Sequence, residues 1–178
     1  MTVGHELARR TGLRLFHNHA TIDLALRFFD FGEPAYQRLV SEFRKRIFEE
    51  VASSDAPGLI FTYVWAFDDP SDAAFVESLS KIFRSQGGSV FYVELEAPQS
   101  VRLHRNGTPF RLAEKPTKRD LETSRAQLLQ DDAKYRLNSL QEFQGRADYL
   151  RIDNTDLEPG LAAEQIIDTF GLRRESGF

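Results

Sequence analysis

The densest group of residues that could do chemistry is a run of cations in a chain that is acidic overall. The formal net charge is −4, yet the segment from residue 104 to residue 125 is rich in arginine and lysine. Its cations are Arg105, Arg111, Lys115, Lys118, Arg119 and Arg125. So many like charges repel one another unless an anion lies among them, and arginine suits phosphate because its planar fork can donate two hydrogen bonds at once. The segment therefore indicates a phosphate site. The alternative is a solvated face paired with Glu114, Asp120 and Glu122.

A second candidate site contains His17 and His19, with Asp23 one helical turn further on. The histidines follow a short predicted strand, and open α/β sheets bind ligands at the carboxyl ends of their strands. A transition-metal site is disfavoured because no further histidine and only one carboxylate lie nearby. A neutral histidine can accept a hydroxyl proton near pH 7, so substrate positioning or proton transfer is one interpretation. A polar loop that caps the next helix is the other.

Two more polar groups follow predicted strands, and each has a purely structural explanation. Residues 153–156 (Asp-Asn-Thr-Asp) are typical of a turn. Asp68 and Asp69 follow an apolar segment, where acidic side chains favour the start of a helix.

The elements that must position these residues are indicated by apolar periodicity and by glycine and proline breaks. Helices are predicted over residues 2–11, 21–31, 34–53, 71–86, 98–105, 117–129 and 159–170. Strands are predicted over residues 13–17, 58–67, 89–95 and 149–153. This alternation predicts an α/β protein with a parallel sheet and helices on both faces. The first helix has no strand before it, so the predicted sheet is one strand short.

Composition narrows the class of protein. A length of 178 residues suits a single domain, and the net charge of −4 argues against a general nucleic-acid binder. The chain has no cysteine, which excludes a disulfide framework. No apolar run is long enough to cross a membrane and no signal peptide is visible, so a cytoplasmic protein is expected.

Taken together, these features resemble the small P-loop kinases, a group that includes shikimate kinase, gluconate kinase, adenylate kinase and chloramphenicol phosphotransferase. More closely, the chain is similar to a bacterial branch of shikimate-kinase-like AAA-family ATPases. The resemblance runs almost end to end and is carried by residues 1–12, 15–19, 58–65, 115–120 and 151–155. It implies a three-layer P-loop NTPase sandwich and ATP-dependent phosphoryl transfer to a small-molecule acceptor, with Mg²⁺.

In such kinases the first strand runs into a Gly-x-x-x-x-Gly-Lys-Ser/Thr loop whose amides and lysine hold the phosphates. Here Met1 and Thr2 match the two positions after that lysine. The resemblance therefore implies that the first, central strand and the phosphate loop are missing from this sequence, as a mis-assigned start codon would cause. Thr2 is the remaining hydroxyl for the nucleotide and for Mg²⁺. We expect negligible kinase activity from these 178 residues alone.

The same resemblance implies roles for the other candidates. Residues 106–116 would be a lid over ATP, and residues 20–52 would bind the phosphate acceptor. The phosphoryl contacts would be Arg105, Arg111 and Arg119, supported by Lys115 and Lys118. Asn154 and Thr155 would border the adenine base, and His17, His19 and Asp23 would contact the acceptor. The rival hypothesis is a non-catalytic relative that acts as a binding or interaction module. The acceptor and the oligomeric state stay open.

Overall fold

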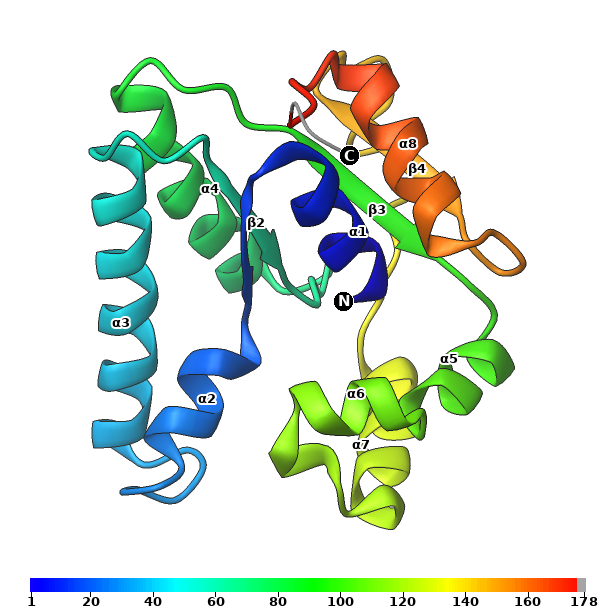
Figure 1. Cartoon of the computed structure of the whole chain (residues 1–178). Coiled ribbons are helices and arrows are strands. Elements are labelled where there is room, and N and C mark those ends of the chain that lie inside the picture. The colour runs from blue at the N-terminus through cyan, green and yellow to red at the C-terminus, as the bar shows by residue number, and fades with distance from the viewer. Residues whose placement is uncertain (176–178) are drawn as a thin grey trace.

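The structure is a computed structural model, and it describes residues 1–175 (Figure 1). Within these residues helices and strands alternate along the chain, as the sequence predicts. In order they are α1 (Thr2–Thr11), β1 (Arg14–His17), α2 (His19–Ala25), α3 (Pro34–Ala52), β2 (Leu59–Thr62), α4 (Pro70–Ser85), β3 (Tyr92–Glu96), α5 (Gln99–Asn106), α6 (Pro109–Glu114), the 3₁₀ turn η1 (Pro116–Lys118), α7 (Leu121–Lys134), β4 (Tyr149–Asp153) and α8 (Pro159–Phe170).

The four strands form two separate parallel pairs. β1 pairs with β2 in a register that sets Arg14 beside Leu59, and β3 pairs with β4 in a register that sets Tyr92 beside Tyr149. The sequence predicts a parallel sheet that lacks its first, central strand, and the described residues form two small parallel sheets. The reason is that no strand of the described residues lies between β2 and β3, so their inner edges have no backbone partner.

Helix α1 joins the two pairs through a shared apolar core. Its Val3 and Leu7 are buried against Ile152 of β4 and the apolar face of α8. Ile60 of β2 and Val93 of β3 pack against the same cluster, so side chains from both sheets meet under α1. Figure 1 shows α1 crossing the space between β2 and β3.

Several helix ends lie where glycine and proline predict them. Gly12 and Gly171 end α1 and α8 in the left-handed conformation, with φ of 72° and 58°, which glycine adopts without steric cost. Pro34, Pro70 and Pro159 stand in the first turn of their helices, where a missing N–H costs nothing. The N-cap of α4 is Asp69, whose carboxylate accepts a hydrogen bond from the Ser71 amide at 2.9 Å.

Three predicted elements are corrected. The strand over residues 58–67 is confined to β2, because β1 ends at His17 and the last bond, from the Asn18 amide to the Thr62 carbonyl, leaves the later residues without a partner strand. The helix over residues 21–31 begins earlier and ends at Ala25, after which the chain turns and exposes Phe28 and Phe31. Residues 106–116, predicted without regular structure, contain α6.

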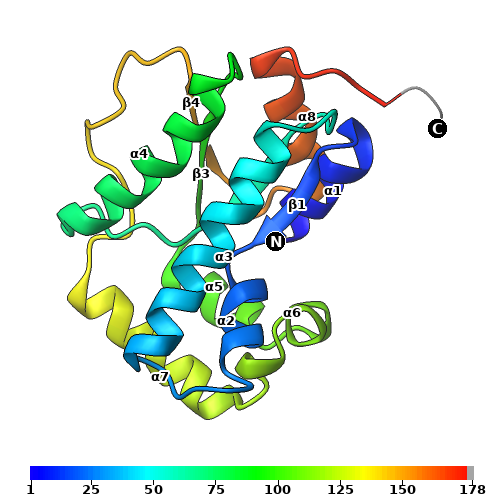
Figure 2. The ribbon, with the colours of Figure 1, turned by 90° about the vertical axis from the view of Figure 1, so that its left-hand side faces the viewer.

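Helix α2, which begins the segment predicted to bind the acceptor, and the predicted lid lie at the same end of the molecule. Both views place α2, α6 and α7 at the end toward which the amino terminus of α1 points (Figures 1 and 2). In the described residues, no helix is both long enough and apolar enough to span a membrane.

Candidate functional site

A group of cations and histidines lies near the amino terminus of α1, where Lys115 and Arg111 act on the Met1 amino group. We call it the cationic cluster, and its members are Arg111 of α6, Lys115, Lys118 of η1, His17 and His19. The side chains come from three places: the carboxyl end of β1, the start of α2 and the chain that runs from α6 into η1. Charge repulsion between members of the cluster lowers the pKa values of His17, His19, Lys115 and Lys118. Arg111 is one of the cations that cause this repulsion.

Lys115 is the most unusual member because it is only 8% exposed. Burial lowers the pKa of its ammonium from the ordinary 10.5 to about 8, and repulsion from Arg111 and Lys118 adds to the effect, with Asp23 opposing it. Its ammonium has no hydrogen-bond or ion-pair partner among the residues that the structure describes. A buried cation without a partner is costly, so the position favours an anion from outside the chain.

Arg111 shows the same deficit. Its Nε is buried and has no hydrogen-bond partner within residues 1–175. Burial lowers the pKa of the guanidinium, although the group stays charged at neutral pH. Its planar donors are therefore available to a phosphate or carboxylate.

The two histidines are neutral near pH 7. Burial lowers the pKa of His19 to about 3, with Lys115, Lys118 and Arg111 contributing, and burial also lowers the pKa of His17. The Nδ1 atom of each ring is buried and lacks a partner in the described part of the chain. Neutral imidazoles can donate or accept one hydrogen bond at each nitrogen, so both rings can contact a ligand without adding charge.

The first turn of α1 contributes backbone donors to the same place. Met1 stands at the N-cap and no side chain caps the helix. The pKa of the Met1 α-amino group is lowered to about 6 by burial and then by Lys115 and Arg111, which places those cations beside the helix end. Unpaired amides at a helix amino terminus attract anions, and here buried cations without partners point to the same ligand.

Arg44 of α3 holds the turn that carries the histidines. Its Nε donates to the Thr21 hydroxyl at 3.1 Å, and its Nη2 donates to the Asn18 carbonyl at 3.2 Å. These bonds join α3 to the chain between β1 and α2. The sequence analysis missed Arg44. The signal was its position, because a charged residue there falls on the same helix face as the buried Tyr36, Val40 and Phe48.

Two contacts dock α6 and η1 against their neighbours. His5 Nε2 of α1 lies 3.3 Å from Glu114 Oε2, and the His5 ring meets the ring of Phe110 edge to face, with centroids 5.1 Å apart. On the other side, the Thr117 hydroxyl donates to Asp23 Oδ1 at 2.5 Å. Helix α6 of the predicted lid is thus held to α1, and η1, which follows it, is held to the predicted acceptor-binding segment.

The remaining predicted residues lie in other surroundings. Arg105 donates to the backbone carbonyls of Asn154 at 2.7 Å and Thr155 at 2.9 Å, so these three form a group beside β4. The Thr155 hydroxyl is buried and unpartnered within the described chain. Arg119 is exposed and donates to the Leu112 carbonyl, and Thr2 is exposed at the start of α1.

The residues present do not form a protein cage for a metal ion. Among residues 1–175, no three histidine, aspartate or glutamate side chains are grouped so that they could hold one. A magnesium ion at the cationic cluster would need most of its oxygen ligands from phosphates and water, because Thr2 supplies one hydroxyl and the neighbouring lysines repel a free cation.

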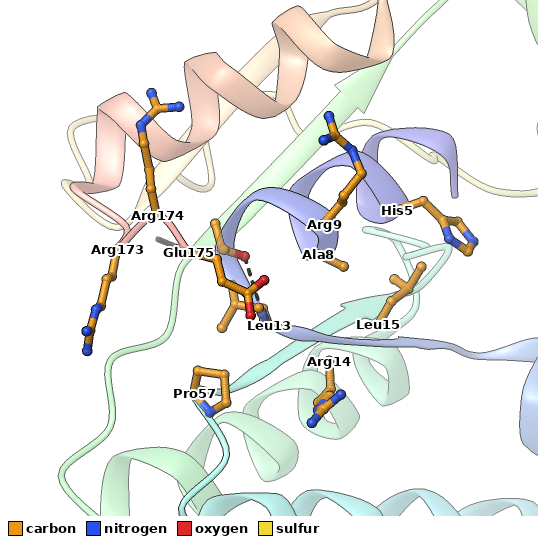
Figure 3. Close-up of a pocket in the computed structure, with 12 residues that line it drawn as sticks. His5, Ala8, Arg9, Leu13, Arg14, Leu15, Pro57, Arg173, Arg174 and Glu175 are labelled. Atoms are coloured by element: carbon orange, nitrogen blue, oxygen red, sulfur yellow. Dashed lines mark hydrogen bonds between the residues drawn. The ribbon is translucent and has the colours of Figure 1, made fainter. Parts of the chain in front are cut away.

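A cavity of about 780 Å³ lies elsewhere, along α1 and at the start of β1 (Figure 3). Arginines dominate its rim, but Arg9 pairs with Glu6 at 2.9 Å and Arg174 pairs with Asp168 at 2.9 Å. The hollow opens widely to solvent, and its rim does not include the cationic cluster. We therefore place the candidate site at the cationic cluster rather than at this cavity.

Comparison with known proteins adds information on the fold alone. No protein-family model matches the chain, and no curated protein is significantly similar in sequence. Among solved structures, the chain is similar to the tunicamycin resistance protein of Deinococcus radiodurans, with a TM-score of 0.50 and 22% identity over 99% of this chain and 94% of that chain. The architecture is compatible with a P-loop kinase-like fold. At this identity the likeness carries no activity or substrate to this chain, and nothing found supports a shikimate kinase in particular.

Proposed function

We propose that the cationic cluster binds the phosphates of ATP and that the protein transfers a phosphoryl group to a hydroxyl of a small molecule. The observation that carries the proposal is Arg111, whose buried Nε has no partner in the described chain, together with the largely buried side chain of Lys115 near the amino terminus of α1. The kinase-like fold and the family resemblance support the same conclusion.

The arrangement suits phosphoryl transfer, which depends mainly on positioning and on neutralising charge. Amides of the first turn of α1 would donate to phosphate oxygens, while Lys115 and Arg111 would neutralise them. Asn154 and Thr155 remain our proposal for the border of the base, with Arg105 holding that loop. Thr2 would be the residue of α1 that helps to hold the Mg²⁺ that accompanies ATP, and the ion would supply further neutralisation of phosphate charge.

The first test is binding of ATP to the full chain, measured by isothermal titration calorimetry with Mg²⁺ present. Lys115→Gln should weaken binding by roughly 10- to 100-fold, because a hydrogen bond to a charged group contributes about 1.5–3 kcal/mol. Lys81→Gln is the matched control, since Lys81 is exposed on α4. Equal affinities of wild type and Lys115→Gln would contradict the proposed site.

The second test seeks the acceptor. The chain and ATP would be incubated with sugars, nucleosides, shikimate-like acids and antibiotics, and ADP formation would be followed by a coupled assay. Tunicamycin belongs in the panel because the structural neighbour is a tunicamycin resistance protein. Turnover of one compound would identify the acceptor and support a kinase over a binding module, whereas ATP binding without turnover agrees with the negligible activity expected of these 178 residues alone.

A further inference from the structure

An apolar face is exposed to solvent on α2 and α3, the two helices on the side of the molecule that Figure 2 turns to the viewer. We call it the α2–α3 face, and it consists of Leu24, Phe28, Leu39, Phe43 and Ile47. The last three stand four residues apart on α3 and so form one stripe along that helix. Phe28 is 71% exposed, and a groove of about 250 Å³ lies between α2 and the stripe. Large apolar side chains that gather in solvent mark an interaction surface.

The α2–α3 face is separate from the cationic cluster. Asp23 of α2 faces η1, where its carboxylate accepts the Thr117 hydroxyl hydrogen at 2.5 Å. Leu24 is the next residue and points about 100° away around the helix, since an α-helix has 3.6 residues per turn. The residues that line the groove are all apolar, whereas the cluster is built from lysine, arginine and histidine. An anionic ligand of the cluster therefore does not account for this face, which fits a second, apolar partner.

The charges beside the stripe indicate what that partner is. Along one edge of the stripe, exposed charges alternate in sign at every fourth residue, in the order Arg38, Glu42, Arg46 and Glu50. Arg46 pairs within the helix with Glu50 at 2.5 Å, while Arg38 and Glu42 have no ion-pair partner among residues 1–175. When two copies of α3 lie antiparallel, each positive position of this edge meets a negative one. A parallel pair would instead set each charge against the same charge.

The mixture of signs disfavours a lipid surface as the partner. An anionic membrane attracts clusters of lysine and arginine rather than both signs together. Among residues 26–50, the exposed charged side chains are four cations and four anions, namely Arg27, Arg38, Lys45 and Arg46 with Asp30, Glu33, Glu42 and Glu50. The face therefore suits a partner with the same balance of charge.

We propose that the α2–α3 face joins two copies of this chain, with their α3 helices antiparallel about a two-fold axis beside Phe43. This proposal does not depend on the proposed ATP site. Such an interface is isologous, so both copies contribute the same residues and the charged edges lie side by side. Phe43 would contact Phe43 of the partner subunit, and Ile47 of the partner subunit would contact Leu39 and fill the groove. With a rise of 1.5 Å per residue, Glu42 would lie within about 3 Å, along the helix axis, of Arg46 of the partner subunit.

The first measurement is the mass of the chain in solution by sedimentation equilibrium. A small interface should dimerise with a Kd on the order of 10 µM, so the wild type should approach twice its 20.4 kDa as concentration rises. Phe43→Glu should raise this Kd by about tenfold or more, because it sets two carboxylates together at the axis. Leu161→Glu, at an exposed apolar position of α8, is the matched control and should leave the Kd within about twofold of wild type.

The charged edge is tested by reversing its signs. Glu42→Arg should raise the Kd by about threefold to tenfold, because like charges would then face each other across the interface. The double variant with Glu42→Arg and Arg46→Glu should restore the wild-type Kd, because both signs are exchanged together. This comparison keeps the proposal open to refutation even if circular dichroism shows that Phe43→Glu misfolds.

Cross-linking tests the position of the axis. The chain has no cysteine, so an introduced thiol is the only one present. Phe43→Cys should form a disulfide-linked dimer under mild oxidation, because a residue on the axis faces its own copy. Ser41→Cys, which is exposed on another side of α3, should not.

Three results would overturn the proposal. One is a wild type that stays monomeric at about 200 µM, far above the expected Kd, and binding to vesicles of phosphatidylcholine and phosphatidylserine would then make a lipid surface the partner. Another is a dimer whose Kd is the same in wild type, Phe43→Glu and Glu42→Arg, since its interface would lie elsewhere. The third is a cross-link that Ser41→Cys forms as readily as Phe43→Cys.

Discussion

Replacing Lys115 by methionine should stabilise the protein while removing its ability to bind ATP. Methionine has a side chain of similar length and fills much the same space, but it removes the ammonium of a residue that is only 8% exposed and has no ion-pair partner in the described chain. At pH 7 the native protein holds this group charged although burial disfavours the charged form. The difference between the ordinary pKa of 10.5 and about 8 corresponds to about 3 kcal/mol at roughly 1.4 kcal/mol per pH unit.

The free energy of unfolding should rise by about 1–3 kcal/mol, because relaxation of the structure around the ammonium reduces the cost of holding its charge. For a chain of this size, the melting temperature should rise by about 3–10 °C, measured by differential scanning calorimetry at pH 7 without ligand. The way in which this stability difference changes with pH follows from proton linkage. The native state binds fewer protons than the unfolded state between pH 8 and 10.5, so wild-type stability rises over that window. The advantage of Lys115→Met should therefore shrink as pH rises from 8 and vanish near 10.5.

Lys81→Met controls for the general effect of removing a lysine, because Lys81 is exposed. A melting temperature below that of wild type at pH 7 would refute the reasoning, since it would show that contacts in the native protein stabilise the charged ammonium. A gain in stability with unchanged ATP affinity would separate the two claims: the ammonium would be unpaired, but the ligand would bind elsewhere.

Two further predictions concern the same regions. Affinity for ATP should fall about tenfold from pH 7 to pH 9, because Lys115 loses its proton in the free protein as pH rises through about 8, and Lys115→Arg should remove most of this dependence in calorimetric titrations. Phe48→Ala should destabilise the protein by about 3–5 kcal/mol in urea unfolding, because Phe48 is buried among Phe16, Phe61 and Phe83. The folded fraction of this variant should bind ATP as the wild type does. A loss of less than about 1 kcal/mol would contradict the packing described for α3.

Local sequence signals predicted most elements because the residues that start and stop them act locally. Gly12 and Gly171 end helices by their own backbone freedom, and Pro34 and Pro159 mark first turns for the same kind of reason. The strand over residues 58–67 was predicted too long because apolar composition does not reveal where the partner strand stops. The ladder ends with His17 and Asn18, which are more than 40 residues away in the sequence.

The sequence indicated which residue types belong to the candidate site, but it did not show how their side chains are arranged. The excess of cations between residues 104 and 125 indicated an anion site, and Arg111, Lys115 and Lys118 do come together with His17 and His19. The sequence could not separate Arg105, which lies against Asn154, from these cations, because that depends on how α5 packs against the loop after β4. The burial of Lys115 was equally hidden, since lysine is exposed in most settings.

The division of the strands into two pairs has a consequence for how the molecule opens. Backbone hydrogen bonds hold β1 to β2 and β3 to β4, while side-chain packing under α1 links the two pairs. Side-chain packing is lost over a short separation, whereas each ladder can survive by itself. Amide hydrogen exchange of these 178 residues should therefore divide into two protection levels, one for each pair of strands, rather than one common to all four.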